Sequence, residues 1–185
     1  AYCADVPDQC TDDRINIELQ WFGPSVISTR TADLLDQGWG RSFNVSFNEL
    51  AQDTHIQEVA LGQYQAALWR QFGAVEPSID RLFLVCRTIG AVSLNFARYC
   101  TDERDALIAQ AQATGDEAER IALWQEISRQ IRDAYTYVFL DHTAWDNAFD
   151  TSVRGVCDRT SPDGVALRCA TTGTTWFSSV WIADD

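Results

Sequence analysis

The alternation of strand-like and helix-like segments in the N-terminal part of this chain constrains its fold most strongly. Residues 15–21 and 43–48 alternate apolar and polar side chains, which is typical of strands that bury one face. Residues 64–69 carry a third, more apolar strand pattern, and a helix-like segment separates each strand from the next. Strands separated by helices are joined by crossover connections. The sequence therefore predicts an α/β fold with a mixed, partly parallel sheet flanked by helices.

The two intervening helices have recognisable ends. Ser25 follows a Gly-Pro turn and is a suitable N-cap for a first helix, which is predicted to run to about Asp36 and to end at Gly38. A second helix is predicted over residues 54–60, with Gly62 as its terminator. These helices supply the connections that a partly parallel sheet requires.

A pair of helices joined by a short turn is predicted after residue 100. Thr101 is expected to cap the first helix, which stops near Gly115. Asp116 is expected to cap the second helix, and Glu119 stands three residues later, as in a capping box. An apolar stripe expected to face the core then recurs at three- to four-residue steps: Ile121, Trp124, Ile127 or Ser128, Ile131 and Tyr135.

The remaining segments give shorter signals. Residues 76–80 predict a short helix or turn, and the apolar run 137–140 with the following residues 141–145 predicts a strand. A Ser-Pro-Asp-Gly turn lies within residues 157–169 and predicts a hairpin or loop closed by a disulfide. Residues 174–182 are rich in β-formers and predict a final strand.

Composition limits the class of protein. The 185 residues suit a single domain, and the apolar runs are too short to span a membrane. The net charge is −13, from 27 acidic residues and 14 basic residues that are all arginine. Such an acidic surface repels phosphate backbones, so no nucleic-acid partner is expected. No signal peptide is visible at the start of the sequence, which begins with Ala1 and looks like a piece cut from a longer polypeptide.

The six cysteines fall into three close pairs along the sequence. Pairing nearest neighbours predicts the disulfides Cys3–Cys10, Cys86–Cys100 and Cys157–Cys169. These disulfides would place the chain in an oxidising compartment outside the cytoplasm, and buried free thiols are the alternative. With no Cys-x-x-Cys motif and only two histidines, neither a metal site nor a cofactor is expected.

The search for an enzyme site finds one weak constellation. His142 stands beside Asp141 and close to Asp146, and a carboxylate–histidine pair can carry out acid–base chemistry in a hydrolase-like enzyme. The other histidine, His55, is predicted to lie on a helix surface. The sequence has no nucleophile elbow, phosphate loop or dinucleotide fingerprint. The sequence therefore predicts a protein that is not an enzyme.

A binding function has more support. Ligands in open α/β sheets lie at the carboxyl ends of the strands, and Trp69, Arg70 and Phe72 stand at the end of a predicted strand. Residues 95–99 form a second loop with polar and aromatic side chains, and they include the candidates Asn95, Phe96, Arg98 and Tyr99. Simple core packing is the alternative for the aromatic residues. Arg98 is the strongest candidate, because an arginine among aromatic side chains needs a partner.

Several segments resemble family 5 extracellular solute-binding proteins, the receptors of peptide and nickel ABC importers. The resemblance rests on an Asn-Phe-Ala-Arg-Tyr loop, an Asp-x-x-Glu-Arg spacer helix, and a Tyr-x-x-Leu-x-His-x-x-Trp strand, here residues 95–99, 116–124 and 137–145. Residues 61–70 resemble a strand of that family that ends in tryptophan, and residues 153–156 resemble the turn that follows its His-Trp strand. The order and spacing of these segments make the resemblance specific.

The resemblance implies the C-terminal lobe of a two-lobed periplasmic-binding-protein fold of type II, similar to cluster C. It implies capture of a peptide or another organic solute together with a missing N-terminal lobe, and delivery to an ABC permease, in the periplasm or anchored at the cell surface. Residues 170–185 are then expected to include a strand that belongs with the missing lobe. A stand-alone protein-interaction module built on the same lobe is the alternative.

The resemblance also bears on the ligand. Peptide-binding members of that family place an aspartate after the tryptophan strand, where it meets the α-amino group of the peptide. Ala74 stands at that position here, and Glu76 keeps an acid nearby. Glu76 therefore joins the expected ligand contacts, and the solute is left open between peptides, oligosaccharides and other organic molecules.

Overall fold

The computed structural model describes residues 2–71, 77–142, 148–156, 159–160, 166–167 and 180–183. The chain divides into two compact units, the first made of residues 1–70 and 82–105 and the second of residues 71–81 and 106–185. The expectation of a single domain over residues 1–185 stays a prediction.

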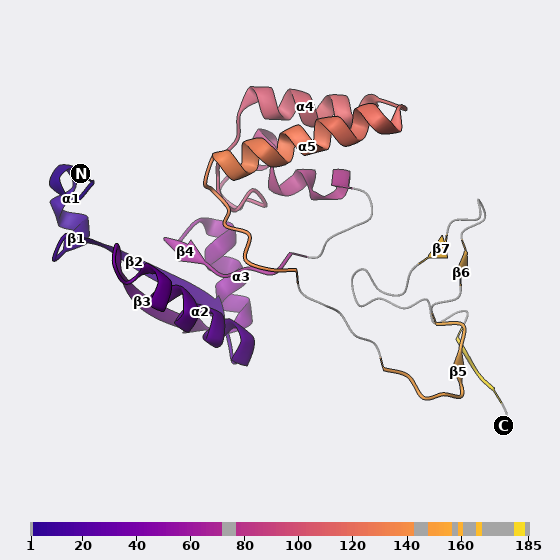
Figure 1. Ribbon diagram of the computed structural model, residues 1–185, viewed down its shortest axis with the longest axis horizontal. Helices are drawn as coiled ribbons and strands as arrows, with labels where there is room; N and C mark the ends of the chain where they lie inside the picture. The colour runs from indigo at the N-terminus through magenta and orange to yellow at the C-terminus, as the bar shows by residue number, and fades with distance from the viewer. Residues whose placement is uncertain are drawn as a thin grey trace. The chain divides into compact units, whose positions relative to one another are not determined.

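The first unit is built on a four-stranded mixed sheet with β2 (Arg14–Phe22) at its centre. Strand β3 (Phe43–Leu50) runs parallel to β2 in a register that pairs Ile15 with Phe43 and Phe22 with Leu50. Strand β4 (Ala66–Ala67) is also parallel to β2, whereas β1 (Cys10–Thr11) is antiparallel to it (Figure 1). The mixed, partly parallel sheet predicted from the sequence is confirmed. Short helices α1 (Tyr2–Asp5) and η1 (Pro7–Gln9) precede the sheet.

Strand β4 is shorter than the six residues that the sequence predicts. The side-chain oxygen of Gln65 accepts a hydrogen bond from the backbone N–H of Glu18 at 2.6 Å. This side chain takes a position where a strand would present a backbone carbonyl, so regular pairing begins only at Ala66. Beyond β4, the N–H of Leu68 still donates to the carbonyl of Gln20 at 2.8 Å.

Helix α2 (Val26–Trp39) begins as predicted and ends later than predicted. Its N-cap Ser25 accepts a hydrogen bond from the N–H of Ser28 at 3.2 Å. Gly38 does not end the helix, since a single interior glycine costs only about 1 kcal/mol. The indole of Trp39 packs against Phe43, with ring centroids 5.7 Å apart, and the helix stops at Gly40.

Helix α3 (Gln52–Leu61) ends as predicted at Gly62, which adopts the left-handed conformation with φ of +74°.

Helix α2 lies along β2 and β3 (Figure 1). The apolar core of this unit is formed by the buried residues Leu19, Trp21 and Ala32, with Leu35, Val45, Ala66 and Leu68 packed against them. Helix α3 reaches the opposite face of β2, because its His55 is hydrogen-bonded to Gln20 there.

The segment after the sheet contains two short 3₁₀ helices, η2 (Pro77–Phe83) and η3 (Cys86–Thr88). The first agrees with the short helix or turn predicted over residues 76–80. Disulfides join Cys3 to Cys10 and Cys86 to Cys100, as nearest-neighbour pairing predicts. The predicted pair Cys157–Cys169 lies outside the described residues.

A helical hairpin follows, in which α4 (Asp102–Ala113) and α5 (Glu117–Asp133) run antiparallel side by side (Figure 1); from Ala106 onward it belongs to the second unit. The predicted caps are present: Thr101 Oγ1 accepts from the N–H of Arg104, and Asp116 Oδ1 accepts from the N–H of Glu119. The return half of the capping box differs. Glu119 accepts from the hydroxyl of Thr114, and that hydroxyl accepts from the N–H of Asp116.

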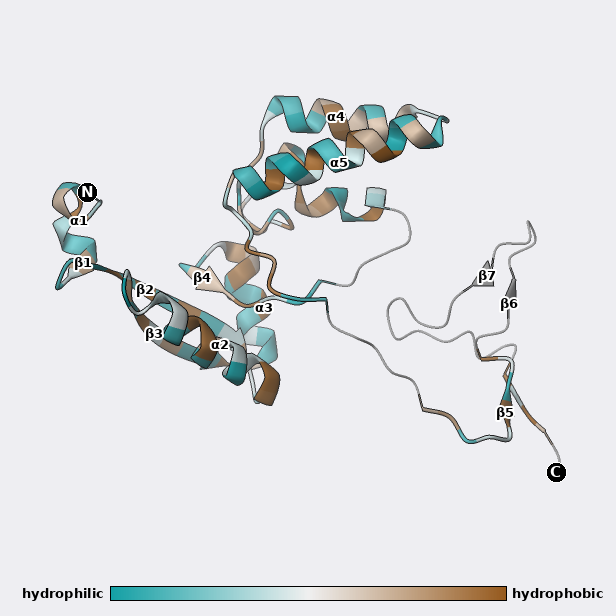
Figure 2. Cartoon of the chain, viewed as in Figure 1, coloured by the Kyte–Doolittle hydropathy of each residue, from teal (hydrophilic) through white to brown (hydrophobic). Residues whose placement is uncertain are grey.

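The buried stripe of the hairpin is narrower than the sequence predicts. Both helices mix hydrophilic and hydrophobic residues along their length (Figure 2), and their buried apolar residues are Ile108, Ala111, Ile127 and Ile131. Ile121 and Tyr135 were expected in the core but are exposed, Tyr135 to 86%. Helix α5 ends before Tyr135, whose φ of +54° takes it out of the helical pattern.

The predicted strand over residues 137–145 is absent from its described part, residues 137–142. Phe139 is 76% exposed there, and its ring lies near that of Tyr137, with centroids 6.4 Å apart. A strand requires a partner, and residues 137–142 pair with no strand of the described chain. Residues 143–145 lie outside the described residues.

Two small antiparallel ladders follow. Strand β5 (Val153–Arg154) pairs with β8 (Trp181–Ile182), and β6 (Arg159–Thr160) pairs with β7 (Ala166–Leu167). The second ladder agrees with the hairpin predicted between the last two cysteines, and β8 falls within the predicted final strand.

Of the helices in the described part of the chain, none has both the length and the apolar character to cross a bilayer.

Candidate ligand-binding site

The carboxyl ends of the parallel strands meet at one edge of the first unit. Strand β2 ends at Phe22 and β3 at Leu50, which pair with each other, and β4 ends at Ala67, opposite Gln20 of β2. This edge is where open α/β sheets bind ligands, because the connecting loops there can form a crevice. The candidates Trp69 and Arg70 follow β4 directly, so the structure places them at this edge.

A row of aromatic rings lies at this edge. The indole of Trp69 stacks on the imidazole of His55, with centroids 5.6 Å apart and planes inclined by 28°. The ring of Trp69 also lies 4.7 Å from that of Phe96, measured between centroids, with planes inclined by 57°. His55 is 6.1 Å from Phe22, and Phe96 is 5.6 Å from Phe83. The structure therefore brings together two predicted site residues, Trp69 and Phe96, with three rings that sequence reasoning did not assign.

The ring of Trp69 is packed in this row and is still accessible to solvent. It is 36% exposed, whereas His55 beside it is fully buried. An aromatic ring that is packed against its neighbours and still partly exposed can offer an apolar stacking surface to a ligand.

His55 is the main correction to the sequence analysis, which predicted a surface histidine. Its side chain is fully buried, Nε2 lies 3.1 Å from the carbonyl of Leu68, and Nδ1 lies 3.3 Å from Nε2 of Gln20. Burial lowers the pKa of His55 below its ordinary value of 6.5, against smaller opposing effects from the Leu68 carbonyl and Glu58. The imidazole is therefore neutral at pH 7. The available sequence signal was its spacing of four residues from Val59, which is also buried on α3.

Three further candidates, Arg70, Phe72 and Glu76, follow Trp69 in the sequence. Arg70 is exposed. Phe72 and Glu76 lie outside the described residues. Their role as ligand contacts stays a prediction.

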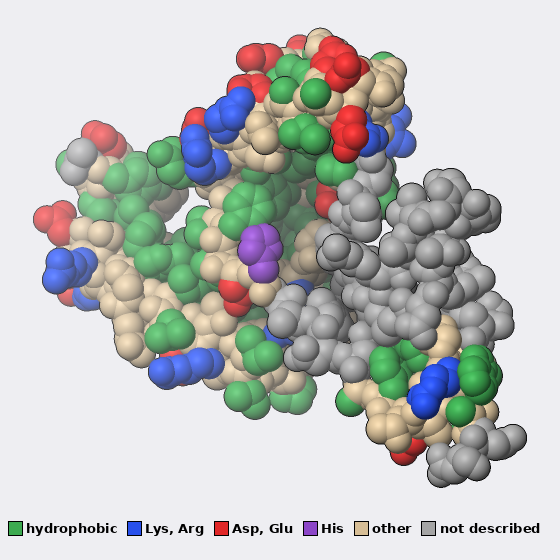
Figure 3. Space-filling view, turned by 45° about the vertical axis from the view of Figure 1, so that its right-hand side comes forward, with side chains coloured by type: hydrophobic (Ala, Val, Ile, Leu, Met, Phe, Trp, Pro, Cys, Tyr) green, Lys and Arg blue, Asp and Glu red, His purple; other side chains and the backbone are tan. Residues whose placement is uncertain are grey.

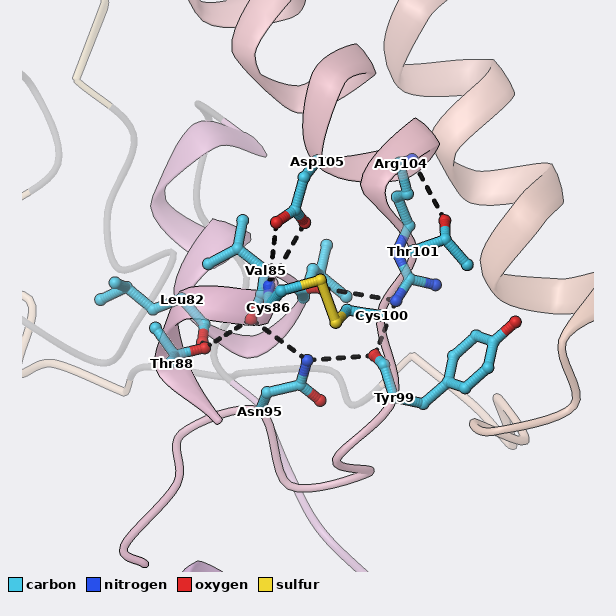
Figure 4. The surroundings of a disulfide bond; sticks show 11 residues. Leu82, Val85, Cys86, Thr88, Asn95, Tyr99, Cys100, Thr101, Arg104 and Asp105 are labelled. Atoms are coloured by element: carbon cyan, nitrogen blue, oxygen red, sulfur yellow. Dashed lines mark hydrogen bonds between the residues drawn. A yellow bond between two sulfur atoms is a disulfide. The ribbon is translucent and has the colours of Figure 1, made fainter. Parts of the chain in front are cut away.

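The predicted loop over residues 95–99 is held largely by internal hydrogen bonds. The side chain of Asn95 is fully buried, and its Nδ2 donates to the carbonyls of Val85 and Tyr99 (Figure 4). Its Oδ1 is buried without a hydrogen-bond partner in the described part of the chain. The carbonyl of Phe96 accepts from the hydroxyl of Tyr64 at 2.7 Å. Asn95 thus fixes the path of the loop.

Arg98 joins the same loop to the end of helix α3. Its guanidinium donates to the carbonyls of Gly90 at 2.6 Å, Ala60 at 2.9 Å and Ala91 at 3.2 Å. The arginine lies against Gly62, where a Cβ would come within 2.3 Å of Arg98 Nε. These contacts account for the partner that an arginine among aromatic residues requires. A ligand contact by Arg98 stays a prediction.

Tyr99 lies beside a second arginine that sequence analysis did not select. Arg104 is only 2% exposed; its guanidinium lies 5.3 Å from the Tyr99 ring centroid and donates to the Tyr99 carbonyl at 2.7 Å. Asp105 accepts from the N–H of Cys86 at 3.1 Å, next to the Cys86–Cys100 disulfide (Figure 4). The loop is therefore held by a disulfide, two arginines and a carboxylate.

The described residues of the candidate enzyme site around His142 are not brought into a catalytic arrangement. Asp141 and His142 are both exposed, and Asp146 lies outside the described residues.

Elsewhere on the surface, acidic and basic side chains are interspersed over the helical hairpin (Figure 3).

Comparisons with known proteins were informative at the level of structure. No protein-family model matches the sequence, and no curated protein is similar enough to count as a match. OppA from Burkholderia pseudomallei matches 99% of this chain with a TM-score of 0.71 at 15% identity, and the match covers 34% of OppA. DppA from Helicobacter pylori, solved in complex with the peptide STSA, matches 93% of this chain at a TM-score of 0.61 and 15% identity, over 32% of its own length.

This chain has a periplasmic-binding-protein fold. A third structure, NikA from Brucella suis in complex with Fe(III)-EDTA, matches 64% of the chain at a TM-score of 0.52 and 20% identity, over 24% of its own length. These neighbours are family 5 solute-binding proteins, the class that the sequence resembles, and the chain spans about a third of the first two. The periplasmic-binding-protein fold predicted from the sequence, present here in part, is confirmed.

Proposed function

We propose that this chain is the ligand-capturing lobe of an extracellular solute-binding receptor that delivers a peptide or another organic solute to an ABC importer. The observation that carries the proposal is the match of 99% of the chain to part of OppA, at a TM-score of 0.71. DppA and AppA from Bacillus subtilis, solved with a tetrapeptide and a nonapeptide, share the fold and favour a peptide solute. NikA, solved with Fe(III)-EDTA, has the same fold and keeps other organic solutes open.

The geometry of the sheet edge supports a binding role. Trp69 offers a partly exposed ring that is packed between His55 and Phe96, so little side-chain freedom remains to be lost when a ligand stacks on it. Arg70 stands next to it as an exposed cation that can orient a polar or anionic group of the solute. The proposed contacts are Trp69, Arg70, Phe72, Glu76, Asn95, Phe96, Arg98 and Tyr99.

The proposed mechanism is capture without covalent chemistry. The solute binds the closed state of a two-lobed receptor better than the open state and so shifts the population towards closure. The closed form then docks on the permease.

The two disulfides suit an oxidising compartment such as the periplasm or the cell surface. Since half of the binding surface belongs to the other lobe, this chain alone is expected to bind its solute weakly.

The proposal is tested by NMR titration of the 185-residue chain with the tetrapeptide Ser-Thr-Ser-Ala, and separately with a mixture of short oligosaccharides. One probe is expected to shift the signals of Trp69, His55 and Phe96 in fast exchange, and Trp69→Ala is expected to abolish the shifts of His55 and Phe96. Trp39→Phe is the matched control, since Trp39 packs on Phe43 away from the row. Shifts caused by neither probe, or turnover that vanishes in His142→Ala, argue against the proposal.

A further inference from the structure

His55 has polar contacts on both sides of its ring and an aromatic contact on its face. Its Nε2 faces the carbonyl of Leu68, so Nε2 carries the proton and donates it there at 3.1 Å. Its Nδ1 then accepts from the amide Nε2 of Gln20 at 3.3 Å. These two bonds fix the plane of the imidazole between β2 and the end of β4. The residue after Leu68 is Trp69, whose indole stacks on that plane.

We propose that His55 is a positioning residue that holds the indole of Trp69 as the aromatic face of the binding site, through the Gln20–His55–Leu68 hydrogen-bond chain. The inference rests on the proposed function, because it assumes that Trp69 contacts the solute. Trp69 is the most exposed ring of this row, at 36%, and it is packed against His55 and Phe96. The orientation of its ring is therefore set by buried neighbours, and His55 is the neighbour with directional bonds.

The chain of bonds depends on a neutral imidazole. If Nδ1 of His55 were protonated, it would become a hydrogen-bond donor. It would then face the amide Nε2 of Gln20, which is also a donor. Gln20 Oε1 is buried and has no hydrogen-bond partner in the described part of the chain. Turning the Gln20 amide would place this oxygen against the protonated Nδ1. Protonation of His55 thus forces a rearrangement beside Trp69.

The charged surroundings of His55 are sparse. Glu58, on the same helix, is the carboxylate that acts on it electrostatically. The groups that face it from β2 are the amide of Gln20 and the ring of Phe22, and from the strand end they are the Leu68 carbonyl and Trp69, all uncharged. Burial against these groups keeps the pKa of His55 below 6.5, so the bonds persist at neutral pH.

The inference is tested by NMR on the 185-residue chain without any ligand, following the indole N–H of Trp69 and the imidazole signals from pH 8 to pH 5. The chain has only two histidines, so the two titrations are easily assigned. The Trp69 signal is expected to shift with the midpoint of His55. His55→Phe is expected to remove this pH response, and His142→Phe is expected to retain it.

Two outcomes overturn the inference. In one, His55 titrates while the Trp69 signal stays unchanged. In the other, the indole signal of Trp21, which lies in the core under α2, shifts with the same midpoint, since this marks unfolding of the whole unit. Because no solute is used, failure of this test leaves the proposed function standing. Failure to bind Ser-Thr-Ser-Ala or oligosaccharides likewise leaves the pH response of Trp69 measurable.

Discussion

Arg70 and Arg98 are both arginines beside aromatic residues, yet the structure gives them opposite environments. Arg70 is exposed at the carboxyl edge of the sheet. Arg98 donates to three backbone carbonyls, one of them at the end of helix α3. Sequence alone ranked Arg98 first as a ligand contact because an arginine there needs a partner. The structure shows that backbone carbonyls can be that partner.

Replacing Arg98 should therefore cost stability. Arg98→Met removes charge-assisted hydrogen bonds to the carbonyls of Gly90, Ala60 and Ala91, and we expect the free energy of unfolding to fall by about 2 kcal/mol. Urea denaturation followed by circular dichroism measures this. Arg70→Met is the matched control and should leave stability within about 0.5 kcal/mol. Equal effects of the two substitutions would contradict a structural role for Arg98.

His55 predicts a pH dependence of stability. Burial lowers its pKa in the folded state below the ordinary value of 6.5, so the unfolded chain binds a proton more readily. The contribution of His55 is fully present above pH 6.5 and is lost as the pH falls below it. Denaturation midpoints measured from pH 8 to pH 5 should decline in that range, and the decline should be smaller in His55→Phe. His142 is exposed, so the decline should persist in His142→Phe. If the decline disappeared in that variant, the effect would belong to His142 and not to His55.

At the scale of elements, two glycines near helix ends differ in a way that the sequence does not reveal. Both follow apolar helical patterns, and both were predicted to end a helix. Gly62 does so with φ of +74°, whereas Gly38 lies within α2 and has open space around its Cα. The difference arises because Trp39 extends α2 by packing on Phe43.

The same alanine substitution should have opposite effects at these positions. Gly38→Ala should stabilise the chain by about 0.5–1 kcal/mol, because glycine is entropically costly in a helix interior. Gly62→Ala should destabilise it by more than about 1 kcal/mol, since alanine disfavours positive φ and its Cβ would meet Arg98. Thermal unfolding of both variants measures the two shifts. Shifts of the same sign would refute the assignment of the two helix ends.

The N-cap of α2 offers a separate test of local structure. Ser25 Oγ accepts from the N–H of Ser28, so Ser25→Ala leaves that N–H without its partner. The expected loss is about 1 kcal/mol of unfolding free energy, measured by urea denaturation. Ser128→Ala is the control, because the hydroxyl of Ser128 bonds within its own helix to the carbonyl of Trp124 and caps nothing. A loss as large in the control would argue against the capping role.

At the scale of the whole molecule, the Cys86–Cys100 disulfide links the two sides of the loop that carries Asn95, Arg98 and Tyr99. It closes a loop with a sequence separation of 14 residues. Replacing both cysteines by serine should lower the free energy of unfolding by about 3 kcal/mol, through the greater entropy of the unfolded chain. The Cys3–Cys10 disulfide closes a shorter loop, with a sequence separation of 7 residues, so the double variant Cys3→Ser and Cys10→Ser should cost less. The opposite ranking in denaturant titrations would show that the loop around Asn95 does not depend on its disulfide.

The sequence by itself determined the order of β2, α2, β3, α3, β4, α4 and α5, the caps at Ser25, Thr101 and Asp116, and two local disulfides. These features depend on side chains close in sequence, whose chemistry and spacing are visible without a fold. The placement of Trp69 at a strand end followed from the same pattern. Its partner Phe96 was predicted as a site residue, although the contact between them was not.

Only the tertiary structure decided which polar residues are buried. His55 lies inside because β2 and the end of β4 supply Gln20 and the Leu68 carbonyl, and neither partner is near it in sequence. Arg104 is buried for the same kind of reason, with carbonyls from the loop before it. Residues 137–140 show the converse: their pattern predicts a strand, but a strand forms only where another strand can accept its hydrogen bonds. Local pattern sets what a segment can form, and long-range partners decide whether it forms and which side chains it buries.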